Sequence, residues 1–250
     1  MTLTIHYFDI VIKNIIQETP DVKTFILVKP LNFSHLPGQF CWLTLPSLRN
    51  VGDSFPRTPM AIASGIHDNE LVFSFRNWGF LTEKFFKLNL GDVLSVSDPL
   101  GTAIPLQLFE SRDIICIAGG TGLTPVRSLM LSLDSNHKPD LYYGAKTPSD
   151  ILYREELKSW HSKVIVERSN GSDNWNGDLG YVTKLLPPNL QIKDKICYIC
   201  GPYPMMQNTV NVLKQLGFPD DQLYVSLEKI ENDEVIGPVF PVSDPNVILL

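Results

Sequence analysis

Hydrophobic positions in the first hundred residues fall into short runs that turn signals separate. These runs are rich in β-branched and aromatic residues and cover 8–16, 22–29, 38–45, 61–64, 70–75 and 93–98. Proline and glycine mark the breaks, as at Pro37-Gly38 and Gly91-Asp92. Short strands at this spacing predict an antiparallel β-barrel or sandwich. One helix-like patch, over 81–90, interrupts them.

Beyond Arg112 the hydrophobic period changes. Strand-like runs over 113–120, 140–145, 163–169 and 196–201 each precede a helix candidate, over 124–133, 151–160, 181–186 and 204–217, and 223–228 forms a last strand. Four strand-then-helix units predict a five-stranded parallel sheet with helices on both faces, a doubly wound α/β domain. We therefore expect a β-barrel domain over 1–108, an α/β domain over 109–227 and a C-terminal tail over 228–250, where prolines interrupt regular structure.

Composition narrows the class of protein. The chain has 250 residues, of which 44% are hydrophobic and 19% charged, as in ordinary globular proteins. A net charge of -6 argues against a nucleic-acid partner, which requires clustered Lys and Arg. No apolar run approaches the ~20 residues that span a bilayer. The N-terminal residues do not show the basic segment followed by an apolar segment that is typical of a signal peptide. We expect a soluble, cytoplasmic protein.

Cysteine and histidine usage predicts no metal site. Cys197 and Cys200 form a CxxC pair, but they lie in one strand-like run. Positions three apart in a strand point to opposite faces, so the two sulfurs would not converge on one metal. The five histidines show no ligand spacing. We expect reduced, buried thiols at Cys41, Cys116, Cys197 and Cys200.

Two glycine turns are the candidate binding elements. Gly119, Gly120 and Gly122 follow a predicted strand and precede a predicted helix, where bare backbone and a helix N-terminus favour a pyrophosphate. The spacing is not GxGxxG, and a plain strand-to-helix turn would need only two glycines. Gly201-Pro202 repeats the arrangement at the end of a later strand. Two such turns on neighbouring strand ends predict a site for one extended dinucleotide.

Three motifs, AGGTGLTPVRS, YYGAKTPSDILYREEL and CGPYPMM, resemble in order and spacing the nucleotide-binding domain of the ferredoxin–NADP reductase superfamily. The resemblance is greatest to the branch of hydrogenase gamma subunits and dihydroorotate dehydrogenase electron-transfer subunits. It covers most of the chain and implies an antiparallel flavin-binding barrel followed by an NAD(P)-binding domain. It also implies that Cys200 lies beside the nicotinamide, although a buried strand-end thiol would look the same. The nucleotide contacts that it implies are Gly119, Gly120, Thr121, Gly122, Ala145, Lys146, Gly201 and Pro202.

The first flavin motif departs from the family pattern, Arg-x-Tyr/Phe-Ser/Thr running on as Ile-Ala-Ser. In RTPMAIAS, alignment of the last three residues places Thr58 at the arginine, Met60 at the aromatic residue and Ala61 at the hydroxyl. Arg57 stands one residue early and faces the opposite side of an extended strand unless a bulge redirects it. Met60 supplies a polarizable substitute for the ring. The flavin contacts implied here are Arg57, Thr58, Pro59, Met60 and Ala61.

A second flavin element, SFRNWGFLTEKFF, is similar to that of the family. The resemblance implies that N–H groups at Gly79 to Thr82 meet the FAD pyrophosphate at a helix start, with Arg76 nearby, which favours FAD over FMN. A turn glycine and a simple helix cap are the structural alternatives. The implied contacts are Ser74, Phe75, Arg76, Gly79, Phe80, Leu81 and Thr82.

Relatives of the nearest branch continue into a four-cysteine iron–sulfur segment, whereas this chain has no cysteine after Cys200. A [2Fe–2S] cluster requires four such ligands, so we expect none. The leading hypothesis is an FAD-dependent NAD(P)H oxidoreductase that passes electrons to a partner protein subunit or a small acceptor. One alternative is a non-catalytic subunit or binding module that has lost flavin. Another is a reductase domain of the oxygenase or haemoglobin type.

The choice of nicotinamide nucleotide depends on the segment that follows the third α/β strand. Glu167 would accept hydrogen bonds from the ribose hydroxyls of NAD and repel a 2′-phosphate. Arg168 would pair with that phosphate, and Lys146 adds positive charge on the same side. Adjacent side chains of an extended segment diverge, so only one faces the ribose. We favour NADH, because an unpaired carboxylate beside a phosphate is the harder conflict to relieve.

Overall fold

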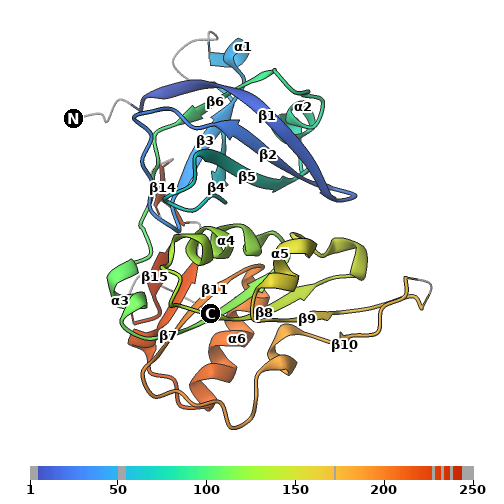
Figure 1. The fold of residues 1–250 in the computed structure, drawn as a ribbon, viewed down its shortest axis with the longest axis vertical. Helices are drawn as coiled ribbons and strands as arrows, with labels where there is room; N and C mark the ends of the chain where they lie inside the picture. The colour runs from blue at the N-terminus through green and yellow to red at the C-terminus, as the bar shows by residue number, and fades with distance from the viewer. Residues whose placement is uncertain are drawn as a thin grey trace.

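Figure 1 shows a barrel of strands above a second sheet that helices cover on both faces. This computed structural model describes residues 5–49, 55–171, 173–226, 229–231, 234–236 and 239–243. The two sheets use separate stretches of the chain, so the predicted class of two unlike domains is confirmed. The boundary that we propose near residue 108 falls within helix α3 (Leu106–Glu110), in the segment that joins the two sheets.

The first sheet is antiparallel, in the order β4-β3-β6-β1-β2-β5. A bridge between Ile62 and Phe73 links the two outer strands and closes the barrel. Alternate residues, such as Phe25 and Leu27, fill its interior. Helix α2 (Phe80–Phe85) packs Leu81 against this core. The strands are β1 (Tyr7–Thr19), β2 (Val22–Val28), β3 (Phe40–Thr44), β4 (Thr58–Ala61), β5 (Glu70–Arg76) and β6 (Val93–Ser97), with a short helix α1 (Pro46–Arg49) after β3.

The second sheet has seven strands in the order β10-β9-β8-β7-β11-β12-β15. The five predicted strands are parallel and lie at its centre, and two short strands extend its edges. They are β7 (Asp113–Gly119), β8 (Asp140–Ala145), β9 (Ser162–Val166), β10 (Asp178–Leu179), β11 (Lys195–Cys200), β12 (Leu223–Ser226) and β15 (Val239–Pro241), the last of which runs antiparallel.

Helices cover both faces of this sheet, as the sequence predicts. Helices α3, α4 (Leu123–Ser132) and α5 (Arg154–Ser159) contribute to one buried cluster, and Figure 1 places α4 and α5 between the sheet and the barrel. Helix α6 (Tyr203–Gln215) packs on the opposite face, together with the 3-10 turn η3 (Val182–Leu185). The remaining 3-10 turns are η1 (Gly120–Gly122), η2 (Pro148–Asp150) and η4 (Asp220–Gln222).

Two helix predictions were too long. The segment over 181–186 forms only the turn η3, because Pro187 and Pro188 follow at once and cannot continue a helix. The segment over 151–160 begins its helix at Arg154, because Tyr153 adopts a left-handed backbone conformation with φ 49°.

The expectation of an irregular tail was wrong. Two short strands, β13 (Lys229–Glu231) and β14 (Glu234–Ile236), pair with one another. Strand β15 then pairs with β12, where Pro241 stands opposite Tyr224. Proline is tolerated there because β15 is an edge strand, so its missing N–H interrupts no further pairing. Within the described part of the chain, no helix combines the length and apolar character needed to cross a membrane.

Candidate functional site

The strand order places a topological switch point at the carboxyl edge of the parallel sheet. After β7 the chain moves outward through β8 and β9, and it then returns to place β11 on the other side of β7. Ala118, near the end of β7, lies opposite Cys200, the last residue of β11. The loops after these two strands therefore diverge at a topological switch point, where open α/β sheets bind their ligands. Both predicted glycine turns are located there.

The first turn contains a glycine in the left-handed backbone conformation. Gly120 has φ +53°, in the left-handed region. Its carbonyl oxygen accepts a hydrogen bond from the hydroxyl of Tyr143, at 3.3 Å. Tyr143 is fully buried, and burial raises the pKa of its phenol. A neutral tyrosine on the neighbouring strand thus holds the turn in place.

The other glycines allow the two turns to pack against each other. A Cβ atom at Gly122 would lie 2.3 Å from the carbonyl oxygen of Cys200, and one at Gly201 would lie 3.0 Å from the backbone nitrogen of Gly119. A Cβ atom at Gly119 would come within 2.3 Å of the Met205 sulfur. The glycines therefore serve the close approach of two backbones, independently of any ligand. Sequence reasoning missed Tyr143 and Met205, whose contacts depend on strand pairing.

Helix α4 begins at this turn with Gly122 as its N-cap and no side-chain cap. The positive end of its dipole therefore remains available to an anion beyond the strand ends. Thr121 lies within the turn itself, and Pro202 opens α6 at the second turn. The arrangement suits the two phosphates of a dinucleotide.

The proposed ribose contacts lie at the same edge of the sheet. The N–H of Glu167 donates to the carbonyl of Ala145, at 2.9 Å, and that of Arg168 donates to Lys146, at 3.2 Å. These bonds extend the pairing of β8 with β9 by two residues, which fixes their backbones side by side. The side chains of Lys146, Glu167 and Arg168 are exposed.

The CxxC pair divides between the two faces of the sheet. Cys197 belongs to the cluster beneath α6, and Cys200 belongs to the cluster on the barrel side. Burial raises the pKa of the Cys197 thiol far above its usual value. All four cysteines lie among the described residues, are buried and form no disulfide. Cys200, the last residue of β11, lies at the switch point and is 9% exposed.

Strand β4 carries the altered flavin motif along an edge of the barrel sheet. Thr58 to Ala61 pair with β3 on one side, and all four side chains are half-buried. Met60 lies opposite Cys41 and packs against the barrel core. The opposite edge of β4 leaves backbone groups able to bond a planar ring, whatever the side chains.

Arg57 lies on the face of the barrel that carries Trp42. Its guanidinium carbon is 4.7 Å from the centre of the Trp42 ring. The positive charge of Arg57 also opposes the rise that burial causes in the pKa of Tyr7. An exposed cation–π contact contributes about 0.5–1 kcal/mol, less than the roughly 1.5–3 kcal/mol of a charge-assisted bond to phosphate. Arg57 is therefore able to leave the ring for a phosphate.

The second flavin element is divided between core and surface. Phe75 stacks on Phe25 with ring centres 4.9 Å apart, and the Ser74 hydroxyl lies 2.7 Å from that of Thr24. Both are buried. Arg76 is half-exposed but pairs with Asp21 at 2.9 Å. Its charge is already compensated, which weakens its attraction for a phosphate.

The turn before α2 combines a buried threonine with two exposed aromatic rings. The Thr82 hydroxyl accepts the N–H of Trp78 and donates to the carbonyl of Gly79, which braces the turn. The N-cap residue is Gly79 and no side chain caps α2, so the helix cap that we considered for Thr82 is not formed. Gly79 has φ +153°, and no atom lies within 4 Å of a Cβ built there. Trp78 and Phe80 are 84% and 61% exposed. Sequence reasoning missed Trp78, for which its place before a glycine is the only signal.

These observations fit a dinucleotide at the switch point and a flavin at the barrel. The groups available to a flavin there are the edge of β4, the first turn of α2 and the exposed rings of Trp78 and Phe80. The side chains expected to bind it differ from the family pattern. Backbone groups thus provide most of the fit.

Comparisons with known proteins agree with this arrangement. Residues 116–211 match the Oxidoreductase NAD-binding domain family. The chain is 28% identical to sulfhydrogenase 2 subunit gamma of Pyrococcus furiosus, over 79% of this chain and 73% of that protein. It is 29% identical to cytochrome b5 reductase 4 of Bos taurus, but spans only 44% of that protein. A ferredoxin NADP+ reductase from Neisseria gonorrhoeae, solved with bound FAD and NADP, superposes with a TM-score of 0.73 over 88% of this chain and 97% of that one, at 18% identity.

The fold, the paired glycine turns and these similarities define an oxidoreductase of the FAD- and NAD(P)H-dependent class. These similarities support the ferredoxin–NADP reductase superfamily that the motifs predict.

Proposed function

We propose that this chain is an electron-transfer reductase that takes a hydride from NAD(P)H onto FAD and passes the electrons to a partner protein or a small acceptor. The observation that carries the proposal is the pair of interlocked glycine turns at the switch point, on the side of the sheet nearest the barrel. When bound, the nicotinamide and flavin supply the hydride chemistry.

The residues of this chain would bind and orient the two cofactors. The turn over 119–122 and the start of α4 would hold the nucleotide phosphates, and Cys200 would lie beside the nicotinamide. Arg57 and the first turn of α2 would hold the FAD phosphates. Trp78 and Phe80 would cover apolar parts of the flavin nucleotide and exclude water.

We also infer that this chain holds no iron–sulfur cluster. Its four cysteines are distributed between the barrel and two faces of the α/β sheet, and none follows Cys200 in the sequence. A cluster needs four thiolates at one place. Electrons would therefore leave directly from the flavin to an acceptor that docks near it.

One set of observations favours a second function, that of a subunit that has kept the fold without flavin. Thr58 and Ala61 offer neither the arginine nor the hydroxyl in the aligned positions, and Met60 packs against the barrel core. The ion pair between Arg76 and Asp21 competes with a phosphate. Against this function, both nucleotide turns are intact.

Flavin content separates the two functions. The purified protein would be heated, and any released flavin identified by chromatography and expressed per mole of chain. Anaerobic addition of NADH or NADPH should then bleach the flavin absorption of the unheated protein. Bound FAD that is reduced in this way supports the reductase. A colourless protein that binds NAD(P)H but no added FAD would establish the non-flavin subunit instead.

A further inference from the structure

Helix α4 is hydrogen-bonded to the segment that directly follows β4, the strand that carries the first flavin motif. The Ser128 hydroxyl donates to the carbonyl of Ser64, at 2.7 Å, and the N–H of Ile66 donates to the Ser132 hydroxyl, at 3.1 Å. A Cβ atom at Gly65 would lie 2.7 Å from the carbonyl oxygen of Leu131. The barrel backbone and the helix thus approach as closely as glycine allows.

Arg127 is the charged residue at the centre of this seam. Its Nε and Nη2 donate to the two carboxylate oxygens of Glu156, at 2.7 and 2.8 Å, and its Nη1 donates to the carbonyl of Ala63, at 2.8 Å. The side chain is only 14% exposed. Burial lowers the pKa of Arg127, but the hydrogen bond and charge of Glu156, together with Tyr153 and Asp68, more than offset it, so the net pKa is raised and the guanidinium stays charged.

The partners of Arg127 are themselves tied to the barrel. Its guanidinium lies 5.3 Å from the centre of the Tyr153 ring, at the residue before α5. The N–H of Tyr153 donates to the Glu18 carboxylate, at 3.0 Å, and Glu18 also accepts a bond from Thr24. Glu156 lies in the first turn of α5, so these bonds also fix its position relative to the barrel. Its two bonds to Arg127 orient the guanidinium towards the carbonyl of Ala63.

The position of Arg127 along the chain links both halves of the site. Ala63 follows the end of β4 by two residues, and its own N–H is bonded to Val72 in the barrel wall. Arg127 follows the glycine turn by five residues, within the same rigid helix. If β4 moved relative to the glycine turn over 119–122, the bond between Arg127 and Ala63 would break.

We propose that Arg127 is a positioning residue that sets the separation between β4, where the flavin would bind, and the glycine turn over 119–122, where the nicotinamide nucleotide would bind. Glu156 orients Arg127. This inference rests on the proposed reductase function. A misplacement of about 1 Å between reacting groups can cost on the order of a hundredfold in rate. Lysine cannot replace Arg127, because one ammonium group cannot bond two carboxylate oxygens and a carbonyl in a fixed plane.

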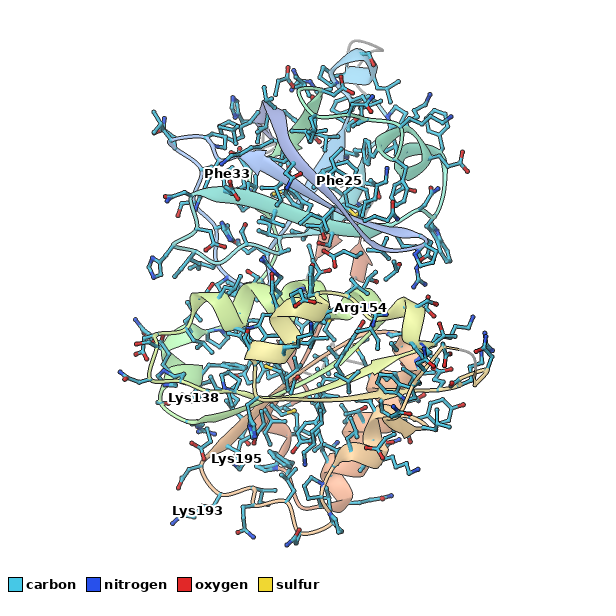
Figure 2. All side chains as sticks on the ribbon, turned by 45° about the vertical axis from the view of Figure 1, so that its right-hand side comes forward. Phe25, Phe33, Lys138, Arg154, Lys193 and Lys195 are labelled. Atoms are coloured by element: carbon cyan, nitrogen blue, oxygen red, sulfur yellow. The ribbon has the colours of Figure 1, made fainter. Side chains whose placement is uncertain are left out.

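The test compares Arg127→Lys and Arg127→Met with Lys195→Met in the full chain. Lys195 is a matched control because it is 15% exposed and pairs with Asp113 at 3.1 Å, on the far edge of the α/β sheet. Figure 2 shows Lys195 at the end of the molecule away from the barrel. Stopped-flow reduction of the flavin by NAD(P)H would give the rate and the nucleotide dissociation constant for each variant.

Both Arg127 variants should slow flavin reduction about tenfold or more and change the nucleotide dissociation constant less than about threefold. Without cofactors, hydrogen exchange over residues 62–68 should accelerate in the same two variants, and Lys195→Met should match the wild type in both measurements. Wild-type reduction rates or unchanged exchange in Arg127→Met would overturn the inference. A wild-type protein whose flavin NAD(P)H does not reduce would overturn the proposed function, and the exchange measurement would still decide whether Arg127 holds the seam.

Discussion

Gly122 lies directly against the backbone of Cys200, so closely that a Cβ atom there would come within 2.3 Å of the Cys200 carbonyl oxygen. The two strand-end turns therefore form one unit, in which neither loop can move alone. This contact connects the packing of the sheet to the proposed nucleotide site.

Gly122→Ala should push the two turns apart. We expect the free energy of unfolding to fall by about 1–3 kcal/mol, as for other overpacked sites, and NAD(P)H to bind more weakly. Gly171→Ala is the control, because Gly171 has φ +77° in an exposed loop with no atom near a Cβ. It should lose about 1–2 kcal/mol of stability and keep its nucleotide affinity. Denaturant unfolding and NAD(P)H titration measure both quantities, and wild-type affinity in Gly122→Ala would contradict the expectation.

Gly79→Val should remove flavin from the protein. A valine at φ +153° is strained by about 1–3 kcal/mol, which corresponds to roughly a 5- to 150-fold loss of flavin affinity if the turn distorts. Gly91→Val introduces the same kind of strain in another barrel loop, where no atom lies within 4 Å. The flavin-to-chain ratio of purified variants is the measurement. If Gly79→Val keeps the wild-type flavin-to-chain ratio, the pyrophosphate lies elsewhere.

Glu167→Ser should shift the nucleotide preference towards NADPH. Glu167 and Arg168 are both exposed beside the end of β8, so removal of the carboxylate leaves Arg168 and Lys146 to attract a 2′-phosphate. Steady-state kcat/KM for NADH and NADPH would be compared in the wild type, in Glu167→Ser and in Arg168→Ser. We expect the wild type to favour NADH. A tenfold wild-type preference for NADPH would show that Arg168 faces the ribose.

His35 should make stability fall at acid pH. Its Nε2 lies 3.0 Å from the carbonyl oxygen of Ser64, and its buried Nδ1 has no hydrogen-bond partner. Burial lowers the pKa of His35 below 6.5, with the Lys29 charge acting in the same direction and Asp68 opposing it. The unfolded chain therefore binds the proton first as pH falls. The contribution to the free energy of unfolding is present above about 6.5 and is lost as pH falls through the folded pKa.

Denaturant unfolding of the wild type and His35→Gln at several pH values between about 5 and 8 tests this. The stability of His35→Gln should vary less over that range. His137 provides a comparison of opposite sign, because bonds to the Glu110 carbonyl and to Asp134 raise its pKa. Its contribution is present below about 6.5 and is lost as pH rises, so His137→Asn should steepen the acid loss. Parallel curves for wild type and His35→Gln would refute the assignment.

Local patterns in the sequence determined the two-part architecture. Alternation in the first hundred residues and strand-then-helix units beyond Arg112 predicted both sheets, because these periods reflect which side of a backbone faces a core. The motifs around Gly119 and Gly201 predicted the nucleotide crevice for a similar reason. Parallel strands bring their carboxyl ends to one edge, so the positions of the turns follow from the order of elements.

Only the tertiary structure decided which side chains meet. Arg57 contacts Trp42, Phe75 stacks on Phe25 and Arg76 pairs with Asp21, and all three contacts depend on which residues of distant segments lie side by side. The bond from Arg127 to Ala63 joins residues 64 positions apart. Such contacts depend on how separate segments pack against each other, and a shift of one residue in a strand's register would move its side chains to the opposite face. The hydrophobic period of a single strand or helix does not contain that information, although it does predict which elements form.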